Sequence, residues 1–139
     1  MNIYFACSIT GGREYEVIYQ GLTAALLADG NEVPTAHLAE SSVVALEAVV
    51  GAREVYERDV IWIRKADALI AEVSVPSHGV GYEIGFGLNV GKPVLCLYQQ
   101  GRKISKMISG NPHPRLSLKA YNDPQEAISL AREFIESLK

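Results

Sequence analysis

The segment from Pro76 to Gly85 carries the strongest chemical signal in the sequence. It follows a short apolar run, Ala68–Val73, that is typical of a buried strand, and it opens an apolar stretch that is typical of a helix. Small residues after a strand let a ligand approach the backbone, and the free N–H groups at a helix start favour an anion. Glu83 lies about one turn into the expected helix. A carboxylate repels a bound anion, so Glu83 is a poor choice for simple anion binding. The arrangement is explained if the anion is the phosphate group of a small molecule and Glu83 reacts with another part of that molecule.

A second acidic residue, Asp59, shares the apolar face of a predicted helix. It stands at helical spacing from Val55 and Ile63, so it points toward the buried side. A buried acid needs a reason, and two remain open: a functional role, or a buried hydrogen bond or helix cap. The flanking Glu57 and Arg58 are expected to face solvent.

The loop Cys7–Arg13 is the third candidate. Its pattern lacks the Lys-Ser/Thr ending of a P-loop and the three-glycine spacing of a dinucleotide fingerprint. The loop is therefore either a tight turn into a helix or a substrate-binding loop. In the second case Ser8 and Thr10 offer hydroxyls, and Gly11 and Gly12 offer open backbone N–H groups.

The remaining candidates are single residues on expected strands and loops. Tyr4 lies on a central strand, where a core tyrosine with a satisfied hydroxyl is the default interpretation. His37 follows a weak strand and can equally be an ordinary loop residue. Ser77 and Ser105 gain interest because their loops are expected on the same edge of the sheet. Two carboxylates near an anion site suggest cleavage of a glycosidic bond, in which one attacks or stabilises the sugar carbon and another group manages protons.

The elements that must position these residues alternate between strands and helices. This alternation predicts an α/β fold, a doubly wound, Rossmann- or flavodoxin-like three-layer sandwich with a five-stranded, mainly parallel sheet. Ligands bind such sheets beyond the carboxyl ends of the strands, where loops 7–13, 73–79 and 99–105 converge. Residues 1–139 are expected to form one domain. Strands are predicted at Asn2–Ala6, Glu32–Thr35, Ala68–Val73, Pro93–Tyr98 and Leu116–Ala120, and helices at Glu14–Asp29, Ser41–Lys65 with a bend near Gly51, Val80–Asn89, Arg102–Ile108 and Pro124–Leu138.

Composition narrows the classes of partner. The formal net charge of −3 provides no electrostatic attraction for a nucleic acid polymer or an anionic membrane. No apolar run reaches the length of a membrane span, and the first residues read as a strand without the basic region of a signal peptide. Cys7 and Cys96 lie in or beside apolar runs, which favours two reduced, packed thiols over the alternative of a disulfide, and with them a cytoplasmic location. No cysteine and histidine spacing indicates a metal site.

Taken together, four stretches resemble the nucleoside 2-deoxyribosyltransferase superfamily, and within it the 2'-deoxynucleoside 5'-monophosphate N-hydrolases. The resemblance extends from Ile3 to the last helix, and the third stretch is the most specific. The stretches are Tyr4-Phe-Ala-Cys-Ser-Ile-Thr-Gly-Gly-Arg-Glu14, Glu57-Arg-Asp-Val-Ile-Trp62, Ala71-Glu-Val-Ser-Val-Pro-Ser-His-Gly-Val-Gly-Tyr-Glu-Ile-Gly85 and Ile104-Ser-Lys-Met-Ile-Ser-Gly110.

The resemblance implies a reaction and roles for these residues. The expected reaction is hydrolysis of the N-glycosidic bond of a 2'-deoxynucleoside 5'-monophosphate, through a covalent intermediate on Glu83. Asp59 would hold the sugar and assist protonation of the base, and Tyr4 would support the nucleophile. The resemblance implies a homodimer in which Ser105 reaches the phosphate in the neighbouring subunit's site. It also implies that the reaction needs no cofactor and no metal. The full set of expected substrate-binding residues is Cys7, Ser8, Ile9, Thr10, Gly11, Gly12, Arg13, His37, Ser77, Gly79, Gly81, Ser105, Lys106 and Met107.

Two departures from the family pattern affect the substrate side of the site. Thr10 stands where the hydrolases have an arginine, which bears on phosphate affinity or on the choice of base, and Cys7 stands where they have a glycine. Two other functions remain open. A deoxyribosyltransferase would pass the sugar to a second base, and a nucleotide-binding module would not turn over its ligand.

Overall fold

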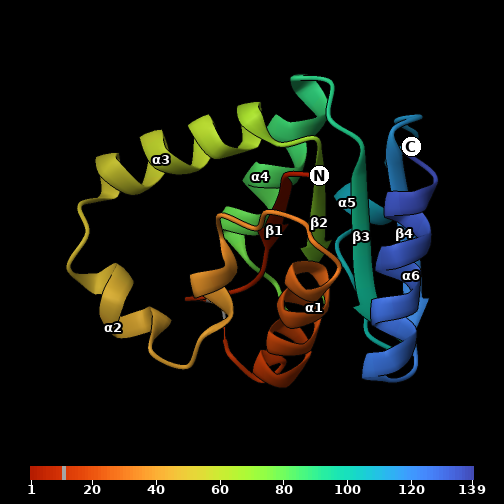
Figure 1. The fold of residues 1–139 in the computed structure, drawn as a ribbon, viewed down its shortest axis with the longest axis horizontal. Helices are drawn as coiled ribbons and strands as arrows, with labels where there is room; N and C mark the ends of the chain where they lie inside the picture. Colours follow the sequence, from red (N-terminus) through yellow and green to blue (C-terminus); the bar gives the residue numbers. More distant parts are fainter. Residues whose placement is uncertain (11) are drawn as a thin grey trace.

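A computed structural model describes residues 1–10 and 12–139 of the chain. Its centre is a parallel sheet in which neighbouring strands follow the order β1-β2-β3-β4 (Figure 1). β1 and β2 are buried along their whole length, as expected for strands that are covered on both faces. Within the described residues the strands are β1 (Ile3–Ala6), β2 (Ala68–Glu72), β3 (Val94–Gln99) and β4 (Leu116–Tyr121).

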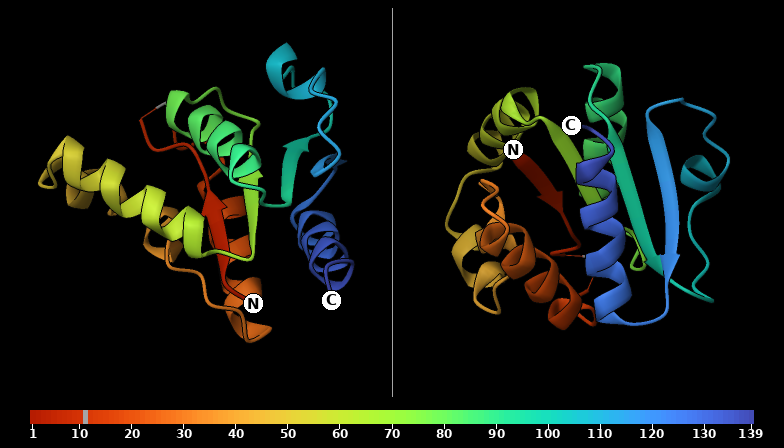
Figure 2. Two further views of the ribbon diagram at one scale, coloured as in Figure 1. Left: turned by 90° about the horizontal axis from the view of Figure 1, so that it is seen from above. Right: turned by 45° about the vertical axis from the view of Figure 1, so that its right-hand side comes forward.

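Helices cover both faces of this sheet and make three layers (Figure 2). α1 and α6 pack together on one face, and α4 lies on the other with the C-terminal end of α3. The predicted three-layer α/β fold with a parallel sheet is therefore confirmed. The helices are α1 (Glu16–Ala28), the 3₁₀ turn η1 (Ala36–Ala39), α2 (Val43–Ala48), α3 (Ala52–Lys65), α4 (His78–Asn89), α5 (Lys106–Ser109) and α6 (Pro124–Glu136).

The predicted fifth strand, Glu32–Thr35, is wrong: in the described residues the sheet has four strands. This segment makes one isolated parallel bridge, between Asn2 and Glu32. Pro34 then offers no N–H, and the Thr35 hydroxyl, rather than a backbone carbonyl, accepts the hydrogen bond from the Phe5 N–H at 2.9 Å. A side chain thus completes the edge of β1, and the chain turns into η1.

The predicted long helix over residues 41–65 is divided into α2 and α3, and the break falls at the expected glycine. Gly51 has an extended backbone with ψ 145° and stands directly before α3. Not all apolar residues of α3 face the core: the side chain of Ile61 is 49% exposed, while Ile63 is buried. In Figure 1 the N-terminal part of α3 extends beyond the sheet, so only its C-terminal turn has a core to face.

Two capped helices end the fold. Asp123 accepts a hydrogen bond from the Glu126 N–H at 2.9 Å and Pro124 starts α6, so the predicted cap is confirmed. The expected helix over 102–108 is shorter, because Ser105 caps α5 and the helix begins only at Lys106.

No helix among the residues that the structure describes is both long enough and apolar enough to cross a membrane.

Candidate active site

A hydrogen bond between β1 and α4 forms the centre of the site. The Tyr4 side chain is fully buried on the α4 face of the sheet, and its hydroxyl donates to Glu83 Oε1 at 2.7 Å. Glu83 lies in the second turn of α4, as its spacing from the helix start predicted. The bond fixes one of the two carboxyl oxygens. Two residues that are 79 positions apart in sequence are thereby joined at one point.

Burial changes the acid–base properties of both partners. Burial raises the pKa of Glu83 to about 7, and the nearby Asp59 carboxylate adds to that rise, whereas the Tyr4 hydrogen bond and Arg58 oppose it. Burial and the Glu83 charge raise the pKa of Tyr4, so the phenol stays protonated and remains a donor. A carboxylate that is easily protonated near neutral pH is suited to catalysis.

Asp59 reaches the same centre from α3. Its charge acts on Tyr4 and on Glu83, and we call Tyr4, Asp59 and Glu83 the carboxylate cluster. Burial raises the pKa of Asp59, and the Arg58 guanidinium, whose Nε donates to Asp59 Oδ1 at 2.9 Å, partly offsets that rise. The structure therefore brings together the two acids and the tyrosine that the sequence singled out.

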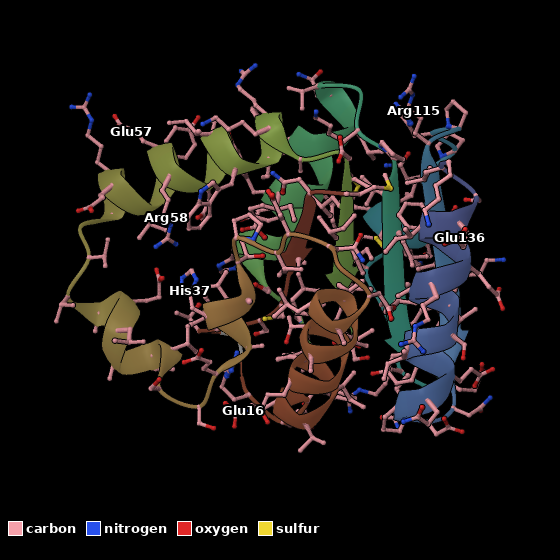
Figure 3. All side chains as sticks on the ribbon, viewed as in Figure 1. Glu16, His37, Glu57, Arg58, Arg115 and Glu136 are labelled. Carbon is pink, nitrogen blue, oxygen red and sulfur yellow. The ribbon has the colours of Figure 1, made fainter. Side chains whose placement is uncertain are left out.

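Arg58 does not face solvent as expected. Its side chain is 22% exposed, and its Nη1 forms an ion pair with Glu47 Oε1 at 3.0 Å while its Nε holds Asp59. The guanidinium also lies over the Trp62 ring, 4.9 Å from the ring centre. Glu57, by contrast, points away from this group as predicted (Figure 3).

His37 extends this group of charged side chains toward η1. Its Nε2 lies 3.2 Å from Glu47 Oε1, and its ring packs edge-on against Trp62 at 6.0 Å between ring centres. His37 and Arg58 approach each other across the space between η1 and α3 (Figure 3). His37 thus belongs to the same group of charged side chains as Asp59.

The N-terminus of α4 forms a second part of the site. Ser77 is the N-cap, and its Oγ accepts a hydrogen bond from the Val80 N–H at 3.3 Å. Thr10, Pro76, Ser77 and His78 line a small hollow of about 170 Å³. A Cβ on Gly79 would meet nothing nearer than Ser77 Oγ at 4.0 Å, so the first turn of the helix is open to a ligand.

Arg13 connects loop 7–13 with η1 and with the first turn of α1. The guanidinium of Arg13 donates to the carbonyls of Ser8 at 3.1 Å, Leu38 at 2.8 Å and Glu40 at 2.9 Å, and it pairs with Glu16. These bonds occupy the side chain with internal partners. Arg13 therefore shapes the loop, and its charge is balanced by Glu16.

The other predicted residues of this loop occupy different environments. Ser8 is fully buried, and its hydroxyl has no hydrogen-bond partner among the described residues. Cys7 packs into the α1 side of the core, where burial raises the pKa of its thiol to about 12. Ile9 is half-buried against that same core, and Gly12 has a φ of 132°. Gly11 lies outside the described residues.

The predicted residues around Ser105 lie on the opposite flank of α4. A cavity of about 620 Å³ separates α4 from α5, and Ser105 and Met107 line it together with Ser77 and Gly81. Glu83 is not among the lining residues, and Met107 is 83% exposed. Lys106 is also exposed. Within one chain the Ser105 group is therefore separate from the carboxylate cluster, although both reach the start of α4.

Sequence reasoning missed Arg58 and Glu47. Arg58 carried a weak signal, because it directly precedes an acid that was expected to be buried. Glu47 carried none, since its approach to Arg58 depends on the break between α2 and α3. In residues 1–10 and 12–139, no three His, Cys, Asp or Glu side chains gather in a way that could hold a metal ion.

The chain is similar in sequence to known proteins of one family. The family model described as nucleoside 2-deoxyribosyltransferase matches residues 3–126. The mouse protein named 5-hydroxymethyl-dUMP N-hydrolase is 43% identical over 113 residues, which cover 78% of this chain, but the chain spans only 65% of the mouse protein. The zebrafish (Danio rerio) protein of that name is 38% identical over 99% of this chain and 98% of its own length.

A solved structure supports the fold. The Clostridium botulinum CMP N-glycosidase BcmB superposes with a TM-score of 0.71, covering 95% of this chain and 99% of its own, at 20% identity. At that identity the likeness concerns the fold. The two proteins therefore share one overall architecture, and this likeness does not by itself assign a function.

Proposed function

The chain belongs to the nucleoside 2-deoxyribosyltransferase family, and from this premise we propose that it hydrolyses the N-glycosidic bond of 2'-deoxynucleoside 5'-monophosphates. The products are a free base and 2-deoxyribose 5-phosphate. The observation that carries the proposal is the Tyr4–Glu83 hydrogen bond at 2.7 Å, with Asp59 in the same cluster. The N-hydrolase names of the mouse and zebrafish relatives support the reaction class.

Glu83 is the nucleophile of the first step. Its free carboxylate oxygen attacks C1' of the sugar, the C1'–N bond breaks, and the bonding electron pair leaves with the base. The 2-deoxy sugar lacks an electron-withdrawing 2'-hydroxyl, so positive charge develops at C1' more easily. Tyr4 holds the second carboxyl oxygen and keeps the nucleophile oriented during this step.

Asp59 manages the proton. In its protonated form, which burial favours and the Arg58 ion pair opposes, the Asp59 carboxyl supplies a proton to the departing base and becomes a carboxylate. In the second step this carboxylate takes a proton from water while the water oxygen attacks C1'. The ester bond to Glu83 breaks, the Glu83 carboxylate is regenerated, and 2-deoxyribose 5-phosphate is released. Both acids return to their starting states, as turnover requires.

The 5'-phosphate binds at the start of α4. The hollow that Ser77 and Thr10 line receives it beside the open first turn at Gly79, and the free N–H groups of the helix favour its charge. Thr10 contributes a hydroxyl where the family pattern has an arginine, so this chain relies on neutral donors there. Phosphate binding that is remote from C1' aligns the sugar with Glu83 and contributes to turnover.

A second copy of the chain completes the site. The cavity between α4 and α5 and the exposed Met107 provide an apolar surface beside Ser77. A partner seated there would bring its own Ser105 close to the phosphate of the first chain. Ser105, Lys106 and Met107 then act across the interface, and Gly81 lets the partner approach α4.

The two cysteines support a reducing compartment, and we place the enzyme in the cytoplasm as one domain. Cys7 and Cys96 are both buried, free thiols. Burial raises the pKa of each thiol to about 12, which keeps them unreactive. Each packs on a different face of the sheet, Cys7 toward α1 and Cys96 toward α4, so they act as small apolar residues.

A substrate panel tests the proposed function. Purified protein is incubated with deoxynucleoside monophosphates, ribonucleoside monophosphates and unphosphorylated deoxynucleosides, with and without a second free base, and free base is measured by chromatography. Release of base from the deoxynucleoside monophosphates alone supports the proposal. A new nucleotide that contains the added base would instead identify a transferase, and binding without base release would identify a non-catalytic module.

A further inference from the structure

A second buried carboxyl lies at the end of β2, outside the carboxylate cluster. Glu72 is the last residue of β2 and is completely buried. Its side chain belongs to the α1 and α6 face of the sheet, because residues alternate between faces and Ala68 and Ile70 lie on that face. The proposed reaction makes no use of Glu72, so its burial calls for another explanation.

In the part of the chain that the structure describes, Tyr121 and Ser74 donate hydrogen bonds to the Glu72 carboxyl. The Tyr121 hydroxyl donates to Oε1 at 3.0 Å, the Ser74 N–H lies 3.3 Å from both oxygens, and the Ser74 hydroxyl also bonds to Oε1. A carboxylate accepts several such bonds, so these donors suit its ionised form. Burial raises the pKa of Glu72, and the bonds from Ser74 and Tyr121 and the charge of Arg102 oppose that rise.

Ser74 passes this connection to β3 and to the start of α1. Its Oγ accepts a hydrogen bond from the Gln99 N–H at 2.8 Å, at the end of β3. The Gln99 side chain in turn accepts a hydrogen bond from the Tyr15 hydroxyl, directly before α1. One buried carboxyl thus ties together the carboxyl ends of β2, β3 and β4, and it reaches the segment that follows loop 7–13.

The residue after Ser74 connects this network with the phosphate hollow. A Cβ on Gly12 would meet Val75 Cγ1 at 3.6 Å, so Val75 packs directly beneath loop 7–13. Ser77 follows two residues later and lines the hollow with Thr10. The position of Ser74 therefore sets the positions of both sides of that hollow.

We infer that Glu72 and Ser74 are positioning residues, which hold loops 7–13, 73–79 and 99–105 so that Ser77 and Thr10 meet the 5'-phosphate together. The inference rests on the proposed function, since it names what that site needs in order to hold its substrate. Neither residue touches the substrate. Their effect on phosphate binding passes through Val75 and Gly12.

A matched pair of variants at Ser74 tests this inference. Ser74→Ala removes the hydroxyl that bonds both Glu72 and the Gln99 N–H, whereas Ser74→Thr keeps a hydroxyl. Tyr121→Phe removes one donor to Glu72 and provides a second variant in case the alanine variant does not fold. Amide hydrogen exchange is followed over residues 73–77 and 99–102, and KM and kcat are measured with a deoxynucleoside monophosphate.

Ser74→Ala is expected to speed amide exchange in both segments together. It should also raise KM about tenfold while kcat changes little, because displaced loops weaken phosphate binding in the hollow that Ser77 and Thr10 line. Ser74→Thr should behave like the parent. Parental exchange in a folded Ser74→Ala or Tyr121→Phe variant would overturn the inference, and so would faster exchange with an unchanged KM. A parent chain that releases base from no nucleotide removes the proposed function instead, and the exchange measurement still decides whether Ser74 holds loops 73–79 and 99–105.

Discussion

At the scale of single residues, the environment of Glu83 determines what the site can do. Burial and the Asp59 charge raise the pKa of the carboxyl to about 7, and the hydrogen bond from Tyr4 opposes this rise. Burial leaves the ionised form poorly solvated, which makes it a better nucleophile but a poorer contributor to stability.

The stability of the chain should therefore depend on the ionisation of Glu83. The folded state binds the Glu83 proton more tightly than the unfolded state, so the free energy of unfolding falls as pH rises from about 4.5 to about 7. Glu83→Gln removes this loss and should be more stable than the parent at pH 8, by about 3 kcal/mol at most, with no such gain at pH 4. Urea unfolding at both pH values measures the difference, and equal stability at pH 8 would contradict the assignment.

Tyr4→Phe should lower kcat with little change in KM. The lost bond reaches a charged carboxylate and is worth about 1.5 to 3 kcal/mol, which corresponds to roughly a 10- to 100-fold loss in kcat. Tyr56→Phe is the matched control, because its hydroxyl meets only Tyr82 on the exposed surface. Steady-state kinetics of the two variants decide the point: parental kcat in Tyr4→Phe would remove the tyrosine from the mechanism.

At the scale of elements, most helices and strands follow from the pattern of apolar residues, and the failures have local causes. Residues 32–35 have the apolar alternation of a strand, yet Pro34 and the Thr35 hydroxyl end the pairing after one bridge. Ile61 is apolar but stands two positions before the buried Ile63, about 200° around the helix, so it faces away from the core. An apolar pattern alone does not show where a side chain, such as the Thr35 hydroxyl, takes the place of a neighbouring strand.

The site shows the same division. Glu83, Tyr4 and Asp59 were predictable because an acid beside glycines, an acid on an apolar face and a family pattern all pointed to them. The Arg58–Glu47 ion pair was not, since it joins two helices whose relative placement depends on the break at Gly51. Contacts between elements depend on the fold, and a periodic pattern carries no information about them.

Two helix caps provide a matched test at this scale. Ser77 caps α4 and Asp123 caps α6, and each side chain accepts one backbone N–H. Ser77→Ala and Asp123→Ala should each lower the free energy of unfolding by about 1 kcal/mol. Only Ser77→Ala should also reduce the preference for a monophosphate over the unphosphorylated nucleoside. Urea unfolding and the ratio of kcat/KM values measure both effects, and an equal loss of preference in the two variants would show that stability alone is responsible.

At the scale of the whole molecule, the account requires two chains. The α4–α5 cavity and the exposed Met107 form the surface that a partner would cover. Met107→Glu places a charge in that surface and should shift the protein from dimer to monomer and lower its activity on monophosphates. Val17→Glu on α1, where the native side chain is 74% exposed, is the control for an added surface charge. Light scattering with size-exclusion chromatography measures the mass, and a parent chain that is monomeric at assay concentration would refute the shared site.

The central claim is that a Glu83 oxygen attacks C1' of the sugar. The most direct measurement is the rate of base release from a deoxynucleoside monophosphate by Glu83→Gln, beside the parent and the exposed control Glu57→Gln. Gln is nearly the same size as Glu but a far weaker nucleophile, so we expect a loss of about 10³-fold or more in Glu83→Gln and a parental rate in Glu57→Gln. A folded Glu83→Gln variant that releases base within about tenfold of the parental rate would contradict the account.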